Sequence, residues 1–283
     1  MEKNILQEKT VATAKTTLNN GVLMPLLGIG VFQIKEGEDV ENAIQKALEE
    51  GYRSIDSAMI YENEVGVGKA IKSSGLPRED IFITSKVWNA DHGFDSTLKA
   101  FELSRRKLNV DIIDLYLIHW PGKDKYIDTW RALEQLYMDG SVRAIGVCNF
   151  QIHHLQTLIS ASEIVPAVNQ VECHPLLSQR ELRQWCNEQG IQMEAYSPMM
   201  RGRLKNWPLL AELSETYGKT LAQIVLRWHI QNGVVVIPKS VTPSRIRENA
   251  QIFDFELSTD DMNRIDQLNL DLRIGLDPDQ LLF

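Results

Sequence analysis

Four side chains suited to proton transfer lie at or just beyond the ends of three apolar segments. Asp56, Lys86 and His119 each follow or close such a segment, and Tyr61 lies shortly beyond Asp56. If the segments are parallel strands of one sheet, their carboxyl ends share an edge. A carboxylate, a phenol, an amine and an imidazole would then meet there, as general acid–base chemistry requires. The spacing therefore predicts an active site built on strand ends.

Each of the four also has an ordinary structural interpretation. Asp56 could cap the next helix, Lys86 could be a solvated lysine at the rim, His119 a structural histidine, and Tyr61 a packing residue. The shared site is favoured because three apolar segments each deliver a titratable group, and lysine is rarely buried without a partner.

The elements that must position these groups alternate along the chain. A short hairpin is predicted at 16–24, where Asn20-Gly21 suits a tight turn. Strands are predicted at 26–32, 53–56, 81–86, 112–118, 142–147, 167–172, 191–196 and 234–237, and helices near 37–50, 63–73, 95–108, 127–138, 151–160, 178–189, 208–217, 220–231, 243–250 and 259–268.

Eight strands separated by helices indicate right-handed parallel crossovers, and eight such units close a barrel. We therefore expect the α/β class and a (β/α)8 TIM barrel with an N-terminal β-hairpin and extra helices. The alternative is a doubly wound open sheet. An open sheet of that kind would carry a glycine-rich nucleotide-binding fingerprint. Gly28-Ile29-Gly30 lacks the third glycine of that fingerprint, which weighs against the open sheet. Residues 1–15 are expected to form a flexible tail and residues 16–283 a single barrel domain.

Composition limits the function classes. The chain has 283 residues, 43% of them hydrophobic and 24% charged, as in globular proteins. A net charge of −8 argues against nucleic-acid binding, and no apolar run approaches bilayer length. Three scattered cysteines fit a reducing compartment, and neither they nor the histidines have the spacing of metal ligands. We expect a cytoplasmic protein, monomeric by default, with no membrane partner and no metal.

The segment after the last strand offers an independent signal for an anion. Thr242 suits the N-cap of the following helix and Pro243 its first turn. Backbone N–H groups and the helix dipole attract anions there, and Lys239 and Arg245 add positive charge. Phosphate sites of barrels lie in this region. The alternative is a capped surface helix with solvated charges.

Several short stretches follow one another in order along the chain, namely 51–58 GYRSIDSA, 60–64 IYENE, 84–88 TSKVW, 117–121 LIHWP, 146–150 GVCNF, 168–170 VNQ, 195–198 AYSP and 237–242 IPKSVT. Together they resemble the aldo-keto reductase family, and the resemblance covers roughly residues 16–275. In its compact form the chain is most similar to the prokaryotic branch of this family, which includes glyoxal and 2,5-diketogluconate reductases.

The resemblance implies a catalytic role for each strand-end group. Tyr61 would be the general acid that protonates the substrate carbonyl oxygen. Lys86 would lower the pKa of its phenol, Asp56 would pair with Lys86, and His119 would orient the carbonyl.

The resemblance also implies NADPH as cofactor and a small-molecule carbonyl substrate. Lys239, Ser240 and Arg245 would hold the 2′-phosphate, with Thr242 close by. Other residues implied to contact the cofactor are Asp56, Asn149, Gln170, Tyr196, Ser197, Arg201, Glu248 and Asn249, and those implied to contact the substrate are Phe32, Trp88, His119 and Trp120.

The expected function is therefore NADPH-dependent reduction of aldehydes and ketones, with small aldehydes and dicarbonyls as first candidates. Two alternatives stay open. One is a non-catalytic NADPH-binding regulatory subunit of the same fold, and the other is a lyase or isomerase that uses Lys86 as a Schiff base. Glu172 is interpreted as a solvated charge.

Overall fold

Eight parallel strands in chain order form one sheet at the centre of the molecule. The structure is a computed structural model that describes residues 10–122 and 125–280, apart from the side chains of residues 205–206. The strands of the sheet are β3 (Ile29–Gly30), β4 (Ser54–Asp56), β5 (Phe82–Val87), β6 (Ile113–Ile118), β7 (Val142–Cys148), β8 (Val168–Glu172), β9 (Gln192–Tyr196) and β10 (Val235–Val236).

The first and last strands of the sheet meet and close it. Leu27 pairs with Val236 in parallel. The Gly28 N–H donates to the Val236 carbonyl at 2.9 Å, and the Val236 N–H donates to the Leu26 carbonyl at 3.1 Å. The sheet is therefore a closed barrel, which confirms the (β/α)8 prediction. Its closing strands are shorter than the predicted 26–32 and 234–237.

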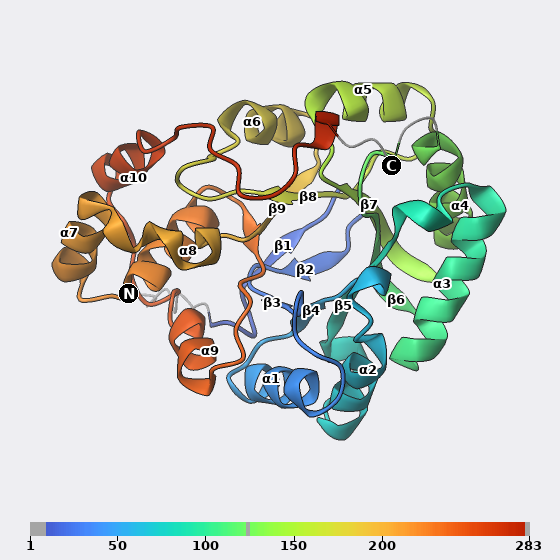
Figure 1. Cartoon of the computed structure of the whole chain (residues 1–283), viewed down its shortest axis with the longest axis horizontal. Coiled ribbons are helices and arrows are strands. Elements are labelled where there is room, and N and C mark those ends of the chain that lie inside the picture. The colour runs from blue at the N-terminus through green and yellow to red at the C-terminus, as the bar shows by residue number, and fades with distance from the viewer. Residues whose placement is uncertain (1–9, 123–124, 281–283) are drawn as a thin grey trace, which may run out of the picture.

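Helices surround the barrel (Figure 1). They are α1 (Glu38–Glu49), α2 (Glu64–Ser73), α3 (Phe94–Leu108), α4 (Tyr126–Met138), α5 (Ile152–Ser160), α6 (Arg180–Glu188), α7 (Pro208–Tyr217), α8 (Leu221–Gln231), α9 (Pro243–Ala250) and α10 (Thr259–Asp266). Two of them, α7 and α8, separate β9 from β10, and α9 and α10 follow β10, which accounts for the expected extra helices. None of the helices in the described ranges combines the length and apolarity that crossing a bilayer would take.

Local sequence explains why these elements form. In α1, Val40, Ala43, Ile44, Ala47 and Leu48 recur every three or four residues and are all buried against the barrel. In the central strands β5 and β6 all six residues are buried, because side chains on one face fill the barrel and those on the other face meet the helices. The barrel interior and the layer under the helices are thus two separate apolar regions that share the same strands.

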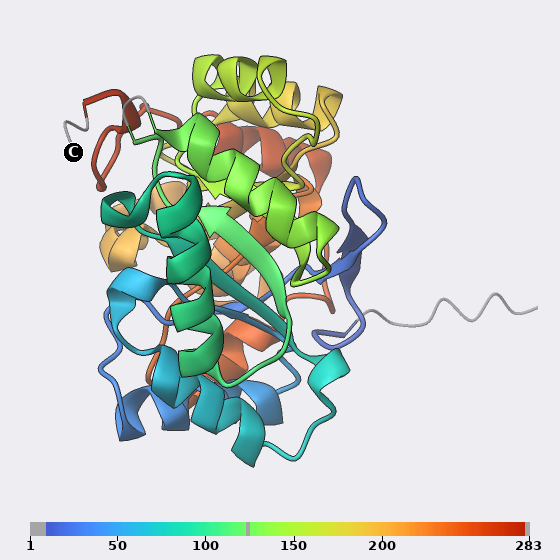
Figure 2. The same cartoon turned by 90° about the vertical axis from the view of Figure 1, so that its right-hand side faces the viewer.

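A hairpin of β1 (Lys15–Thr17) and β2 (Leu23–Pro25) covers the amino end of the barrel. Its Leu18 and Met24 pack against Phe82 and Ala167, which lie at the starts of strands. The hairpin lies on the opposite side of the molecule from the C-terminal segment (Figure 2). The carboxyl ends of the strands are therefore the open face.

The expected loose tail of residues 1–15 needs correction over its described part. Residues 1–9 lie outside the described residues, whereas Val11 and Ala14 are buried. The Ala14 carbonyl also accepts a hydrogen bond from the Leu26 N–H at 2.9 Å. Residues 10–15 are thus part of the packed structure, because two small apolar side chains and one backbone bond dock them beside the first strand.

Candidate active site

The structure brings Asp56, Tyr61, Lys86 and His119 together at the carboxyl ends of β4, β5 and β6. The Lys86 Nζ donates to both carboxylate oxygens of Asp56, at 2.7 and 2.9 Å, and to the Ser57 carbonyl at 2.9 Å. The same nitrogen lies 3.5 Å from the Tyr61 hydroxyl. The ring of His119 is 5.8 Å from that of Tyr61, edge to face. An acid, an amine, a phenol and an imidazole therefore form one continuous cluster.

A buried amide holds the loop that carries Tyr61. This residue ends the 3-10 helix η1 (Met59–Tyr61). Two residues later, the side chain of Asn63 donates to the backbone carbonyls of Val31 and Ile34 and accepts from the Ser57 hydroxyl. These bonds tie the loop after β4 to the loop after β3, so the tyrosine is held over the rim.

Burial and charge set the protonation states in the cluster. Burial opposes the charge on Lys86, but Asp56 and the other groups around it more than offset this, so the pKa of the ammonium is raised. Burial raises the pKa of the Tyr61 phenol, and Lys86 lowers it only in part. Burial and the charge of Lys86 lower the pKa of His119 well below its ordinary value. At neutral pH the cluster holds a charged lysine, a protonated phenol and a neutral imidazole.

This pattern corrects one detail of the sequence-based expectation. Lys86 does act to lower the pKa of Tyr61, as expected, but the net shift in this structure is upward. The physical reason is that removing a phenolate from water costs more than one neighbouring ammonium returns.

The two amides expected at the cofactor are held by protein groups in this structure. Gln170 donates through Nε2 to Asp56 and to Glu194, both at 2.8 Å. Asn149 donates to the His119 carbonyl at 3.0 Å and accepts from the Tyr196 hydroxyl at 2.7 Å. Both amides therefore lie in the same network as the four strand-end groups.

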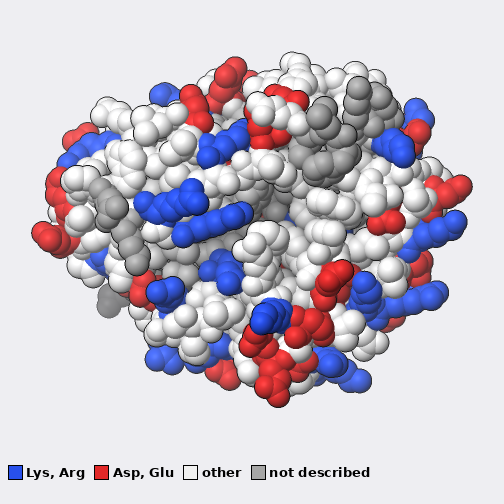
Figure 3. All heavy atoms as spheres, viewed as in Figure 1, with Lys and Arg blue, Asp and Glu red and all other residues white. Residues whose placement is uncertain are grey.

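Aromatic side chains border the cluster on the open face. Phe32 is 43% exposed, and its ring lies 5.0 Å from that of Tyr61. The ring of Trp88 lies 5.2 Å from that of His119, and Trp120 is half-buried next to that histidine. Figure 3 shows this face hollowed at its centre, with basic side chains along the side of the hollow where α8 and α9 lie.

The two residues expected at the cofactor's pyrophosphate lie on the loop after β9. Ser197 and Arg201 both have positive φ angles, 49° and 51°. Arg201 lies in η4 (Met200–Asn206), is exposed, and has its guanidinium 5.9 Å from the ring of Phe32. A cation from this loop thus faces the aromatic border of the open face.

The expected anion-binding segment joins β10 to α9. Thr242 is the N-cap of α9 and Pro243 its first residue. Lys239, Thr242 and Arg245 are exposed, whereas Ser240 is buried and its hydroxyl accepts from the Thr242 N–H at 3.1 Å. Neither Lys239 nor Arg245 forms an ion pair within residues 10–122 and 125–280.

The last two expected cofactor residues lie on α9 itself. Glu248 accepts a hydrogen bond from the Thr220 hydroxyl at 2.7 Å, and Asn249 is buried. The Glu248 carboxylate therefore links α9 to Thr220, the N-cap of α8.

Two glutamates at this end of the barrel were not predicted as functional. Glu172, interpreted as solvated, is fully buried at the end of β8. Its carboxylate accepts from the N–H groups of Ile274 and Gly275, at 2.7 and 2.8 Å, and lies 2.9 Å from the ring nitrogen Nε2 of His174. It thereby holds the C-terminal segment, which runs from α10 past α6 toward α5 (Figure 1).

The second glutamate, Glu194, is fully buried on β9 and accepts from Gln170. A sequence signal for both existed. Glu172 and Glu194 each lie two residues along a strand from an expected site residue, Gln170 and Tyr196, and so share its face.

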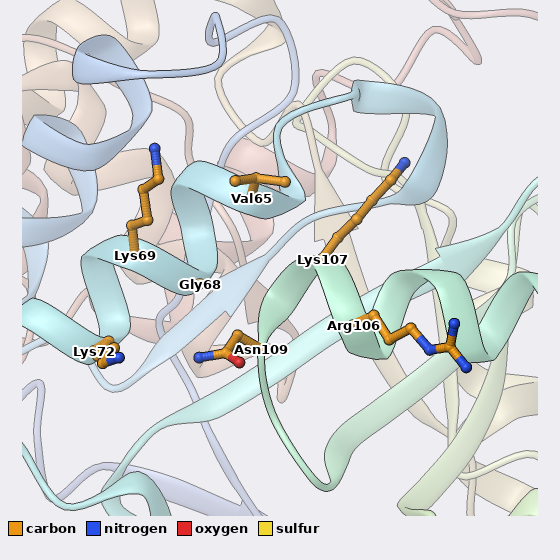
Figure 4. A pocket seen from close by; sticks show the side chains of 7 residues that line it. All are labelled: Val65, Gly68, Lys69, Lys72, Arg106, Lys107 and Asn109. Carbon is orange, nitrogen blue, oxygen red and sulfur yellow. The ribbon is translucent and has the colours of Figure 1, made fainter.

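A separate basic hollow lies outside the barrel, between α2 and α3 (Figure 4). It measures about 500 Å³ and is lined by Val65, Gly68, Lys69, Lys72, Arg106, Lys107 and Asn109. Arg106 and Lys107 belong to the last turn of α3, where cations complement the helix dipole. Helix stability accounts for these charges, and we assign the hollow no function.

One group among the described residues could hold a metal ion, namely His153, His154 and Asp279. The Nδ1 of His154 accepts a hydrogen bond from the Gln151 N–H. This acceptor role places the proton of the neutral ring on Nε2, the nitrogen that faces Asp279. The geometry thus describes a helix cap better than a ligand set. The expectation of no metal stays a prediction.

Comparison with known proteins identifies the family. The family model described as the Aldo/keto reductase family matches residues 26–270. The uncharacterized oxidoreductase YtbE of Bacillus subtilis (strain 168) is 58% identical over 274 residues, covering 95% of this chain and 98% of the relative. A glyoxal reductase of the same organism is 58% identical over 266 residues, covering 94% of this chain and 96% of the relative.

A solved structure agrees with these sequence matches. The structure of a mutant of Gox0644 in complex with NADPH has a TM-score of 0.91 and 41% identity, and covers 95% of this chain and 99% of that chain. The predicted resemblance is confirmed. Because the similarity spans nearly the whole barrel rather than a few motifs, this chain belongs to the aldo/keto reductase family of enzymes.

Proposed function

We propose that the protein reduces small aldehydes and dicarbonyls to alcohols with NADPH. The observation that carries this proposal is the placement of the Lys86 ammonium between the Asp56 carboxylate and the Tyr61 hydroxyl, with His119 beside them. The name of the glyoxal reductase relative and the NADPH complex of the structural neighbour support the substrate class and the cofactor.

The residues after β10 fit an anionic cofactor. Lys239 and Arg245 are exposed cations with no ion-pair partner among the described residues; Lys239 lies on the segment that leads to α9, and Arg245 lies in the first turn of this helix. Together with Ser240 and Thr242 they would hold the 2′-phosphate of NADPH. Tyr196, Asn149 and Gln170 would contact its nicotinamide end. When bound, NADPH supplies the hydride.

The protein groups would then handle the proton. Neutral His119 can donate a ring N–H to the carbonyl oxygen and orient it toward Tyr61. Because burial raises the pKa of Tyr61, its phenol keeps its proton until that oxygen becomes strongly basic. Transfer leaves a phenolate beside the Lys86 ammonium, which stabilises it. Asp56 fixes that ammonium in place.

The same geometry weighs against the two alternatives. A Schiff-base lysine must be uncharged to attack a carbonyl, whereas Asp56 helps to raise the pKa of Lys86 and keeps it charged. A purely regulatory NADPH-binding subunit would not need an acid held against a buried lysine. The complete cluster therefore supports catalysis.

We also propose that the enzyme acts as a cytoplasmic monomer. Cys148, Cys173 and Cys186 are all free and buried, which supports folding in a reducing compartment.

Replacing Tyr61 tests the proposal. Tyr61→Phe keeps the ring but removes the acid, so we expect turnover of glyoxal or methylglyoxal to fall roughly 10²–10⁴-fold. NADPH binding, followed by quenching of tryptophan fluorescence, should be retained. The matched control Tyr137→Phe alters a tyrosine on α4 and should keep wild-type turnover. Near-normal turnover in the Tyr61→Phe variant would remove this residue from the role of general acid.

A further inference from the structure

A carboxyl group that the proposed mechanism does not use lies inside the barrel. Glu194 is fully buried in the middle of β9, in register with Gln170 of β8 and Val235 of β10. A lone carboxyl in such a place is unfavourable unless it is hydrogen-bonded or uncharged. Its position therefore calls for a specific partner.

That partner is the Gln170 amide, which also contacts the catalytic cluster. The Nε2 of Gln170 lies 2.8 Å from Asp56 Oδ2 and 2.8 Å from Glu194 Oε2. An ionised Asp56 can only accept, so the amide must turn its NH₂ group toward it. The two hydrogens of that group then serve the two carboxyls. Glu194 is thus connected to Tyr61 through Gln170, Asp56 and Lys86.

Charge balance indicates which of the two carboxyls carries a proton. The ionisable groups that act on Glu194 are Asp56 of β4, Lys86 of β5 and Cys148 of β7. Lys86 supplies the positive charge of this set, and Asp56 binds it directly. Ionising both carboxyls would leave an excess negative charge in the barrel.

The surroundings of Glu194 agree with this balance. Burial and the charge of Asp56 raise the pKa of Glu194 to about 8, against the opposing effects of Gln170 and Lys86. Its Oε1 is buried and has no hydrogen-bond partner among the described residues. An unsolvated, unpartnered oxygen is less costly on a neutral carboxyl than on a carboxylate.

We propose that Glu194 is a positioning residue for the carbonyl reduction proposed above: its carboxyl, protonated at neutral pH, holds the Gln170 amide on Asp56 and so fixes Lys86 beneath the Tyr61 hydroxyl. Ionisation of Glu194 in alkaline solution adds a second negative charge next to Asp56. Negative charge at this place raises the pKa of Tyr61, as that of Asp56 does. The phenol becomes a poorer acid and the rate falls.

Kinetics of two substitutions test this role. Glu194→Gln keeps an oxygen for the Gln170 amide and cannot ionise. We expect kcat within about threefold of wild type at pH 7, and an alkaline decline of kcat shifted upward by about one pH unit or more. Glu194→Leu leaves one amide hydrogen without an acceptor. We expect kcat to fall about tenfold or more, with little change in KM.

The matched control is Glu134→Gln, which neutralises another buried glutamate outside the barrel. Glu134 lies on α4 and accepts from the N–H groups of Glu163 and Ile164. This variant should keep the alkaline decline of the wild type. A Glu194→Gln variant with the same pH profile as the control, or a Glu194→Leu variant with wild-type kcat, would overturn the proposal.

The pH dependence of thermal unfolding provides a readout that does not need activity. If the pKa of Glu194 is raised on folding, the native state binds more protons than the unfolded state between about pH 4.5 and 8. Wild-type stability should therefore lose the contribution of this group as pH rises through that window. The difference in Tm between Glu194→Gln and wild type should grow in favour of the variant from pH 5 to 8 and then level off.

The two readouts separate failure of this inference from failure of the proposed function. A protein that reduces no carbonyl with NADPH, yet shows the growing Tm difference, would overturn the proposed reaction and the positioning role but retain the protonated Glu194. A constant Tm difference across this pH range would overturn the protonated Glu194 whatever the activity.

Discussion

At the scale of single residues, the site depends on a lysine that is completely buried. Lys86 has no exposed surface, and its charge is met by Asp56 and by the Ser57 carbonyl. Such a pair adds little net stability, since desolvation offsets most of the attraction. The ammonium of Lys86 lies next to the Tyr61 hydroxyl, so in our proposal the pair serves the reaction rather than stability. Stability and activity should therefore respond differently to its removal.

The double variant of this pair tests that separation. Lys86→Met leaves the Asp56 carboxylate buried without its cation, so we expect the free energy of unfolding to fall by about 3–5 kcal/mol. The double variant Asp56→Asn/Lys86→Met contains no buried charge from this pair and should regain most of that loss. Both variants should be inactive. Urea unfolding with turnover assays checks this. A single variant as stable as wild type would contradict the buried-charge interpretation.

At the scale of elements, the beginning of α9 determines cofactor choice in our proposal. Pro243 opens the helix, Thr242 caps it, and Lys239 and Arg245 stand exposed around its first turn. The helix also carries Arg247, which instead pairs with Glu50 of the C-cap of α1. The same helix thus carries one exposed arginine without an ion-pair partner among the described residues and one that links α9 to α1.

These two arginines give a matched test of the 2′-phosphate assignment. Arg245→Ala should weaken NADPH binding roughly tenfold or more and leave NADH binding nearly unchanged, because one charge-assisted contact to the phosphate is lost. Arg247→Ala should affect neither cofactor. Binding is measured by fluorescence titration with each nucleotide. Equal losses for NADPH and NADH in the Arg245 variant would refute the assignment.

At the scale of the whole molecule, the barrel is closed by its two shortest strands. The β3 and β10 strands have two residues each, and the chain before β3 reaches β10 through backbone bonds of Gly28 and Val236. The Gly30 N–H also donates to the Pro238 carbonyl at 3.3 Å. A Cβ on Gly30 would lie 2.8 Å from the Ile237 carbonyl oxygen. Glycine is therefore needed where the first and last strands approach.

Two glycines on the same segment test this closure. Gly30→Ala pushes against backbone, and we expect it to lower the free energy of unfolding by about 1–3 kcal/mol. A Cβ on Gly28 would meet side-chain atoms only, namely Ser54 Oγ at 2.9 Å, Ser54 Cβ at 3.0 Å and Ile237 Cγ2 at 3.2 Å, and side chains can shift more easily than the backbone carbonyl that faces Gly30. The cost of Gly28→Ala should therefore be smaller. Thermal and urea unfolding of both variants measures the difference. A Gly28→Ala variant that is less stable than Gly30→Ala would contradict a specific need for glycine at position 30.

Much of the fold was accessible from sequence because its signals are local. Helical periodicity placed α1 and α9 within a residue of their observed bounds. Strand ends followed by titratable groups indicated where Asp56, Lys86 and His119 would meet, since parallel strands in a closed sheet present their carboxyl ends on one face. The resemblance to the family supplied the roles proposed for these residues and the cofactor.

The sequence by itself determined the order of strands and helices, the barrel and the four groups at its rim, because periodicity and strand ends are properties of neighbouring residues. Only the tertiary structure decided the environments of Glu172 and Glu194. The residue type alone does not reveal whether a glutamate side chain is exposed to water or buried inside the barrel. The C-terminal segment buries Glu172, and Gln170, Asp56 and Lys86 from three other strands surround Glu194. Contacts between distant segments set the charge that each carboxyl can hold.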